Sequence, residues 1–137
     1  MNDPAYDRVA NAGRLVQFAC HQASLNAGWW NRGNDDLKFE AASGSRFGKA
    51  LVAEKLCLTH PEISEAMEGH RKGLMDDHLP HRQMIEVELA DAVIRIADLA
   101  GALNLDLGGA IAEKMAYNAQ RPDHKAEVRA AAGGKAY

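Results

Sequence analysis

The chain has few cysteines and few of the residues that favour β-strands. Only two cysteines, Cys20 and Cys57, occur in 137 residues, too few for a disulfide framework, so a reducing cytosol is the expected location. Valine, isoleucine and threonine together total 12, against 25 alanines. Alanine loses no side-chain entropy in a helix, whereas β-branched residues are the usual strand formers. The composition therefore predicts an all-α fold.

The sequence also lacks a long apolar run and an excess of basic residues. The longest uncharged stretch, residues 15–31, contains polar side chains at Gln17, His21, Gln22, Ser24 and Asn26, which excludes a membrane span. The 16 basic residues are outnumbered by 19 acidic ones, so no global field attracts a nucleic acid polymer or an anionic bilayer. We expect a cytoplasmic protein that binds neither.

A length of 137 residues is enough for one core and predicts a single domain over residues 1–137. Apolar periodicity predicts main helices over residues 4–25, 49–69, 81–103 and 107–120, with an irregular loop over residues 26–48 and a loosely held tail over 122–137. Pro61 should kink or break the second helix near residues 57–61. Its predicted inward face consists of Val52, Leu56, Ile63 and Met67.

The predicted helix over residues 81–103 is apolar around nearly its whole circumference, which is typical of a buried helix. About four helices leave more apolar surface than one copy can cover. We therefore expect a helical bundle that is completed by homo-oligomerisation, as a homodimer or homotetramer.

Acidic residues form two pairs at helical spacing. Glu62 and Glu65 make a Glu-x-x-Glu pair, and Glu88 and Asp91 make a Glu-x-x-Asp pair on the helix that also carries Arg95. Carboxylates that cluster away from water must take up protons, pair with cations or bind a metal ion, and an all-oxygen set suits Mg²⁺ or Mn²⁺. The alternative is a solvated acidic stripe with one Arg95 salt bridge.

Cationic and aromatic residues offer further candidate ligands for a nucleotide. Lys114, Asn118 and Arg121 follow one another at positions i, i+4 and i+7, so one helix face presents two cations and an amide that suit phosphate oxygens. The alternative for this set is a solvated helix end. Trp29 and Trp30 could stack on a base, although packing in the bundle is the alternative for both.

Three of these elements, in this order, resemble one known family. The Glu-x-x-Glu pair, the Glu-x-x-Asp pair and the segment Lys114 to Arg121, which reads Lys-x-x-x-Asn-x-x-Arg, are similar to motifs of the MazG-type all-α nucleoside triphosphate pyrophosphohydrolases. The resemblance covers roughly residues 49–125. Pro61 departs from it, and the first 48 residues carry no such similarity.

The resemblance implies a function and a set of roles. Glu62, Glu65, Glu88 and Asp91 would hold Mg²⁺, and Lys114, Asn118 and Arg121 would bind phosphates. At such a metal site we expect Glu62 or Glu65 to accept a proton from the attacking water. The substrate would be a nucleoside triphosphate, possibly a deoxynucleotide, cleaved between its α- and β-phosphates for nucleotide house-cleaning or pool control. The main alternative is a helical nucleotide-binding or regulatory module without turnover. A redox metal protein is disfavoured because the Glu-x-x-His motif of such bundles is absent.

Overall fold

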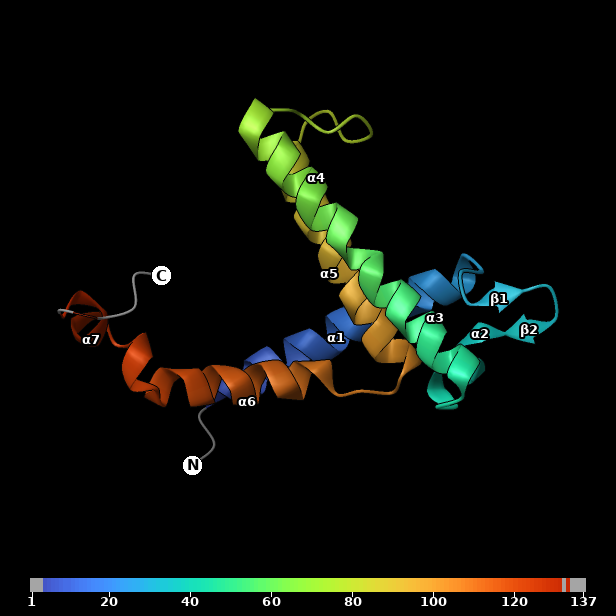
Figure 1. Ribbon diagram of the computed structural model, residues 1–137, viewed down its shortest axis with the longest axis horizontal. Coiled ribbons are helices and arrows are strands. Elements are labelled where there is room, and N and C mark those ends of the chain that lie inside the picture. Colours follow the sequence, from blue (N-terminus) through green and yellow to red (C-terminus); the bar gives the residue numbers. More distant parts are fainter. Residues whose placement is uncertain (1–3, 132, 134–137) are drawn as a thin grey trace. The chain divides into compact units, whose positions relative to one another are not determined.

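The computed structural model describes residues 4–131 and residue 133. Their secondary structure is mostly helical, and the only strands among them form one small hairpin (Figure 1). The predicted all-α class is confirmed at this level. No helix among the described residues is long and apolar enough to cross a membrane.

The described chain contains long helices and a few short elements. In sequence order they are α1 (Pro4–Asn26), β1 (Asn31–Arg32), β2 (Asp35–Asp36), α2 (Leu37–Ala42), α3 (Arg46–Cys57), α4 (Thr59–Lys72), α5 (Met84–Ala102), α6 (Leu107–Gln120), the 3₁₀ turn η1 (Pro122–His124) and α7 (Ala126–Ala130).

The chain groups into two compact units. The larger unit takes in residues 16–105, and the smaller one takes in the described residues before 16 and after 105. In the smaller unit, Arg14 forms an ion pair with Asp106, which also caps α6 by accepting a hydrogen bond from the backbone of Gly109. The prediction of a single domain stays a prediction.

The region predicted as an irregular loop, residues 26–48, is ordered, so that prediction is wrong. It contains the β1–β2 hairpin, in which Asn31 pairs with Asp36, and then α2. Side-chain caps explain the two helix starts that the apolar pattern missed: Asp36 accepts from the backbone of Phe39, and Ser45 accepts from the backbone of Gly48. Helices as short as α2 leave almost no periodic signal.

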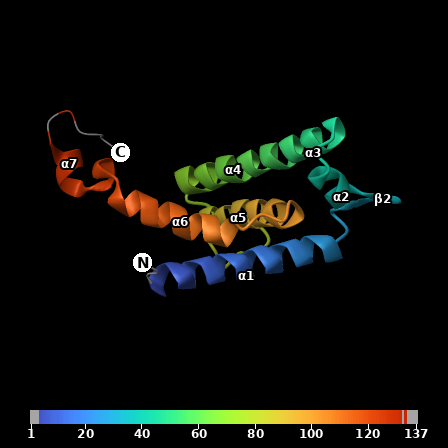
Figure 2. The same ribbon diagram turned by 90° about the horizontal axis from the view of Figure 1, so that it is seen from below.

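The predicted break in the second helix is confirmed. α3 ends at Cys57 and α4 begins at Thr59, with Leu58 between them. Pro61 is the third residue of α4, within the first turn, where a helix leaves its N–H groups without intrahelical partners and proline is therefore tolerated. Figure 2 shows α3 and α4 following nearly one line.

The predicted inward face of this segment is confirmed for Val52, which packs against the core, and is wrong for the other three residues. In the described chain Leu56, Ile63 and Met67 are exposed, Met67 to 68%. The buried face of α4 instead carries Glu62, Ala66 and Gly69. Ala66 and Gly69 are small, and a Cβ added to Gly69 would lie 2.8 Å from the side chain of Met84, so this face allows α5 a close approach.

α4 and α5 form an antiparallel helical hairpin within the larger unit (Figure 1). Its two helices are joined by residues 73–83, which begin at Gly73 in the left-handed conformation, with φ of 63°. Contrary to the prediction for residues 81–103, α5 is not buried all round in one copy of the chain, because Leu89, Val93 and Ile96 are exposed.

The core of the larger unit is centred on Trp30, whose exposed fraction is 0%. Ala41, Leu51, Leu99 and Ala102 pack around it. The indole Nε1 donates a hydrogen bond of 2.8 Å to Asp98 of α5, so the ring contributes apolar contact and one polar tie.

The two neighbouring tryptophans give a matched test of this core. Trp30→Phe should lower the free energy of unfolding by about 1–3 kcal/mol, because it removes the bond to Asp98 and leaves a void. Trp29 is 69% exposed, so Trp29→Phe should change it by no more than about 0.5 kcal/mol. Urea unfolding measures both, and equal losses in the two variants would contradict this account.

Candidate functional site

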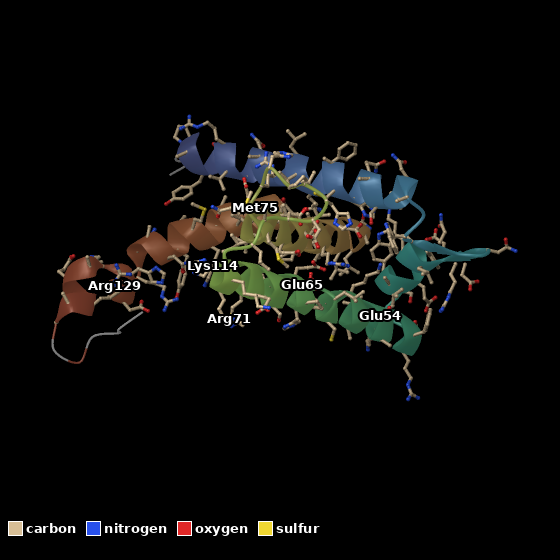
Figure 3. The ribbon with its side chains drawn as sticks, turned by 90° about the horizontal axis from the view of Figure 1, so that it is seen from above. Glu54, Glu65, Arg71, Met75, Lys114 and Arg129 are labelled. Atoms are coloured by element: carbon tan, nitrogen blue, oxygen red, sulfur yellow. The ribbon has the colours of Figure 1, made fainter. Side chains whose placement is uncertain are left out.

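Three of the four predicted metal ligands converge where α4 packs against α5. Carboxylate oxygens of Glu62, Glu65 and Glu88 all lie within 4.8 Å of one another. Glu62 and Glu88 are buried, with exposed fractions of 6% and 7%, whereas Glu65 is exposed. Figure 3 shows Glu65 on α4 beside α5, and Arg71 on the other side of α4.

Helical spacing and small neighbours explain this convergence. Glu62 and Glu65 lie three residues apart and thus on one face of α4, which is also the face of Ala66. Glu88 lies on the face of α5 that includes Ala92. Because both faces have small residues one turn further on, the two helices approach closely and hold the carboxylates between them.

Asp91, the fourth predicted ligand, lies beside this cluster without being part of it. It is half-buried on α5, one turn after Glu88, and its charge is one of those that raise the pKa of Glu88. The structure thus brings together Glu62, Glu65 and Glu88, and places Asp91 next to them.

The carboxyl of Glu88 in this cluster has a raised pKa. Burial raises the pKa of its carboxyl to about 7, from an ordinary value of 4.5. The charges of Glu65 and Glu62, a hydrogen bond with Glu62 and the charge of Asp91 contribute to the same rise. The one arginine in contact with the cluster is Arg95, whose Nε lies 2.5 Å from Oε1 of Glu62, so Glu65 and Glu88 form no ion pair within the part of the chain that is described.

Asp98, two turns after Asp91, is bonded quite differently. Its carboxylate accepts hydrogen bonds of 2.8 Å from Ser24 Oγ and from Trp30 Nε1, and lies 2.8 Å from Nδ1 of His21. His21 Nε2 is buried and has no hydrogen-bond partner among the described residues. Asp98 is therefore held by α1 and the tryptophan rather than by the acidic cluster.

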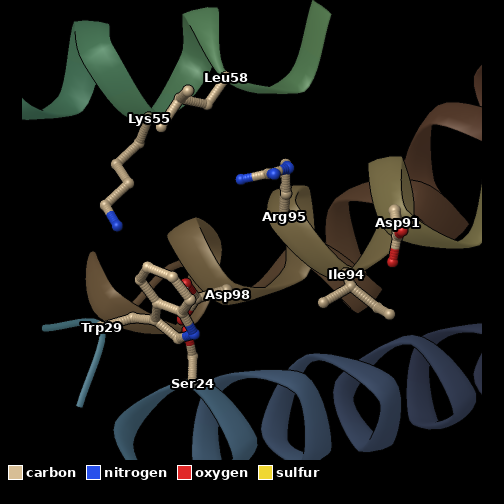
Figure 4. Close-up of a pocket in the computed structure, with 8 residues that line it drawn as sticks. All are labelled: Ser24, Trp29, Lys55, Leu58, Asp91, Ile94, Arg95 and Asp98. Atoms are coloured by element: carbon tan, nitrogen blue, oxygen red, sulfur yellow. The ribbon is translucent and has the colours of Figure 1, made fainter. Parts of the chain in front are cut away.

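A cavity of about 440 Å³ adjoins the cluster within the larger unit (Figure 4). Its wall consists of Ser24 and Trp29, of Lys55 and Leu58 near the end of α3, and of Asp91, Ile94, Arg95 and Asp98 on α5. Asp91 and Arg95 thus face the cavity as well as the acidic cluster, so the cavity and the cluster are adjacent.

Five of the residues in this wall were not predicted as ligands from the sequence: Ser24, Lys55, Leu58, Ile94 and Asp98. A usable signal exists for Lys55 and Leu58, which follow the buried Leu51 at four and seven residues and so belong to the inner stripe of α3. A lysine on an inner stripe indicates a polar space beneath it. No comparable signal identifies Ser24, because the cavity depends on how α1 meets α5.

The two predicted base-binding tryptophans have separate positions. Trp29 is exposed and lies in the wall of the cavity. Trp30 is fully buried beneath Lys55, whose Nζ lies 4.5 Å from the ring centroid. The prediction for Trp30 as a base-stacking residue is therefore wrong in this chain: no face of its ring is accessible, because it fills the core.

The predicted phosphate ligands lie on the smaller unit. Lys114 is exposed, with its Nζ 4.7 Å from the centroid of the Tyr117 ring, and Arg121 forms an ion pair with Asp123. Asn118 Oδ1 is buried and has no partner among the residues described. These three residues lie on α6 and its C-terminal cap, as predicted, and their role as phosphate ligands stays a prediction.

Comparison of the chain with protein-family models, with curated proteins and with solved structures gave no match.

The raised pKa of Glu88 predicts a pH-dependent stability. The folded chain holds this proton more tightly than the unfolded chain does. The free energy of unfolding should therefore fall as the pH rises from about 4.5 to about 7. The loss is at most about 3 kcal/mol and is complete above that range. Glu88→Gln keeps the neutral shape, so it should remove this slope and be more stable than the wild type at alkaline pH.

Urea unfolding at a series of pH values, with a chelator present, tests this prediction. Glu86→Gln is the matched control, because Glu86 lies on the same helix but is exposed and paired with Arg82. A wild-type slope that persists in Glu88→Gln would show that Glu88 is not the group responsible.

Proposed function

We propose that the protein is a Mg²⁺-dependent nucleoside triphosphate pyrophosphohydrolase of the MazG type. The observation that carries the proposal is the convergence of Glu62 and Glu65 of α4 with Glu88 of α5, beside Asp91. These are the residues for which the family resemblance implies metal binding. The products would be a nucleoside monophosphate and pyrophosphate.

The chemistry of the donor set fits a hard divalent cation. All four side chains offer carboxylate oxygens, which Mg²⁺ and Mn²⁺ prefer. The raised pKa of Glu88 supports the fit, because burial and the neighbouring acids disfavour its charged form and a bound cation would stabilise it. A bound cation would supply a water of lowered pKa and would neutralise charge on the phosphate oxygens.

The side chains of this chain would then divide the remaining work. Glu65 is exposed and its carboxylate forms no ion pair among the described residues, so it can reach a water molecule and accept its proton. Glu62 is the second candidate for this role, although its Oε1 already accepts from Arg95. Lys114, Asn118 and Arg121 would steady the phosphates, as the resemblance implies.

A helical nucleotide-binding or regulatory module without turnover is the second candidate function. It is favoured by the cavity beside the cluster, which offers an indole, apolar side chains and two cations without requiring any reaction. Product analysis separates the two, because only the enzyme releases monophosphate and pyrophosphate. For either function we propose the cytosol as the location.

Substitutions in α4 test the enzyme directly. Glu62→Gln and Glu65→Gln should each lower kcat by about 100-fold, because each removes a charge from the cluster while keeping the shape of the side chain. Glu68→Gln is the matched control. Glu68 lies three residues after Glu65 on the same helix but pairs with Arg71 and Lys72. Its kcat should stay within about threefold of the wild type.

The assay incubates each protein with individual nucleoside and deoxynucleoside triphosphates and Mg²⁺, and separates the products by anion-exchange chromatography. Release of diphosphate and orthophosphate would mean that another bond is cleaved. Unchanged turnover in Glu62→Gln or Glu65→Gln would refute the proposed roles, and circular dichroism verifies that the variants are folded.

We also propose that the protein is a homo-oligomer, a homodimer or a homotetramer. The support is the apolar surface that one copy leaves exposed on α4 and α5, including Ile63, Met67, Leu89 and Val93. Burying such surface against a second copy is favourable at roughly 25 cal/mol per Å².

Light scattering should therefore give a mass that is a multiple of 14.9 kDa. Met67→Glu and Val93→Glu place a charge in this surface and should shift the mass toward that of one chain. Ser64→Glu adds the same charge to an exposed polar position of α4 and serves as the control. A wild-type mass of one chain would refute the oligomer.

A further inference from the structure

Arg95 belongs both to the acidic cluster and to the cavity. Its Nε contacts Glu62 on α4, and its side chain lines the cavity together with Lys55 and Trp29. Figure 4 shows the end of the Arg95 side chain in the space between α3 and α5. Its side chain remains 44% exposed, so solvent or a ligand can reach the guanidinium.

The contact with Glu62 uses only part of the guanidinium. Glu62 accepts from Nε, and neither terminal amino group has a hydrogen-bond partner within the described residues. Asp91, four residues earlier on the same helix, is well placed by spacing for an ion pair with Arg95, yet the structure forms the pair with Glu62 instead. Glu62 therefore holds the guanidinium through Nε and leaves both terminal amino groups available to a ligand.

A fixed guanidinium with two free amino groups is suited to an anion. Arginine binds phosphate oxygens through parallel hydrogen bonds from one plane, and a fork that is already held loses less conformational entropy when it binds. Lys55, on the facing helix, adds a second cation to the wall of the cavity. The carboxylate of Asp98 is already held by Ser24, Trp30 and His21.

The remainder of the wall suits the other part of a nucleotide. Trp29 presents an exposed indole, and Leu58 and Ile94 add apolar surface. In Figure 4 Trp29 lies toward the end of the cavity opposite Asp91, with Arg95 between them. A base against Trp29 would thus place its phosphates toward Arg95 and the acidic cluster.

We propose that Arg95 is a phosphate ligand of the nucleotide. It is anchored through Nε on Glu62 and presents its two terminal amino groups to the cavity, so that the cavity and the acidic cluster form one continuous site. This inference rests on the proposed function for the identity of the ligand as a nucleotide. It adds a phosphate contact within the larger unit that the family resemblance did not assign.

Isothermal titration calorimetry tests the role of Arg95. The ligands are the α,β-methylene analogues of dATP, dGTP, dCTP and dTTP in the presence of Mg²⁺, and the corresponding deoxynucleosides, which lack phosphate. Arg95→Gln should weaken analogue binding by about 10- to 100-fold, the loss of hydrogen bonds between charged groups, and leave deoxynucleoside binding unchanged.

Two further variants make the test specific. Arg95→Lys keeps the charge but lacks the fork, so it should weaken analogue binding by a smaller factor, and it decides the question if Arg95→Gln does not fold. Arg82→Gln is the matched control, because Arg82 is half-exposed and pairs with Glu86 of α5 outside the cavity. It should bind the analogues as the wild type does.

Each result has a distinct meaning. Analogue affinity unchanged in Arg95→Gln, or in Arg95→Lys where that variant is decisive, would overturn the inference. An equal loss for analogue and deoxynucleoside would also overturn it, because Arg95 would then only tie α5 to α4. If Arg95→Gln weakens only the analogue but the wild type releases no products, the inference stands and hydrolysis fails. If the wild type hydrolyses the triphosphate but the Arg95 variants bind the analogue as well as the wild type does, the inference about Arg95 is wrong and the proposed function stands.

Discussion

The close packing of α4 against α5 is the constraint on which the candidate site depends. Ala66 and Gly69 have small side chains on the buried face of α4. Met84 of α5 occupies the space that a larger side chain at position 69 would fill. The same face carries Glu62, and the facing helix carries Glu88, so close approach forces carboxylates together in a poorly hydrated place. Burying like charges in this way destabilises the fold unless protons or cations compensate them.

Asp98 shows how the same helix buries a carboxylate without such a conflict. Its oxygens accept hydrogen bonds from a serine and a tryptophan and lie next to a histidine nitrogen, and these groups come from α1 and the segment that follows it. Its neighbours are hydrogen-bond donors instead of other acids, so the protein itself satisfies this group. Glu88 has the opposite surroundings, since the groups that shift its pKa are all acidic. Two buried acids on one helix thus have different surroundings.

Much of the fold could be predicted from the sequence, because long helices have strong periodicity. α1, α5 and α6 lie within a few residues of their predicted bounds, and the break near Pro61 was predictable from the missing N–H of proline. The orientation of α4 was not: the large apolar side chains Ile63 and Met67 dominate its pattern, but the small residues Ala66 and Gly69 determine which face packs. Spacing placed Glu62 and Glu65 on one helix face, and the family resemblance implied that Glu88 joins them. The cavity depends on tertiary contacts that no local pattern records.

Leu58 separates two sets of side chains that the candidate site would use together. Lys55 belongs to α3, and Glu62 and Glu65 belong to α4, with a single residue as the junction. Each residue of a helix turns the next side chain by about 100°. A one-residue insertion or deletion at this junction would therefore rotate the lysine away from the cavity while the hairpin of α4 and α5 kept its carboxylates in place. The length of this junction therefore determines how Lys55 is oriented relative to the acidic cluster.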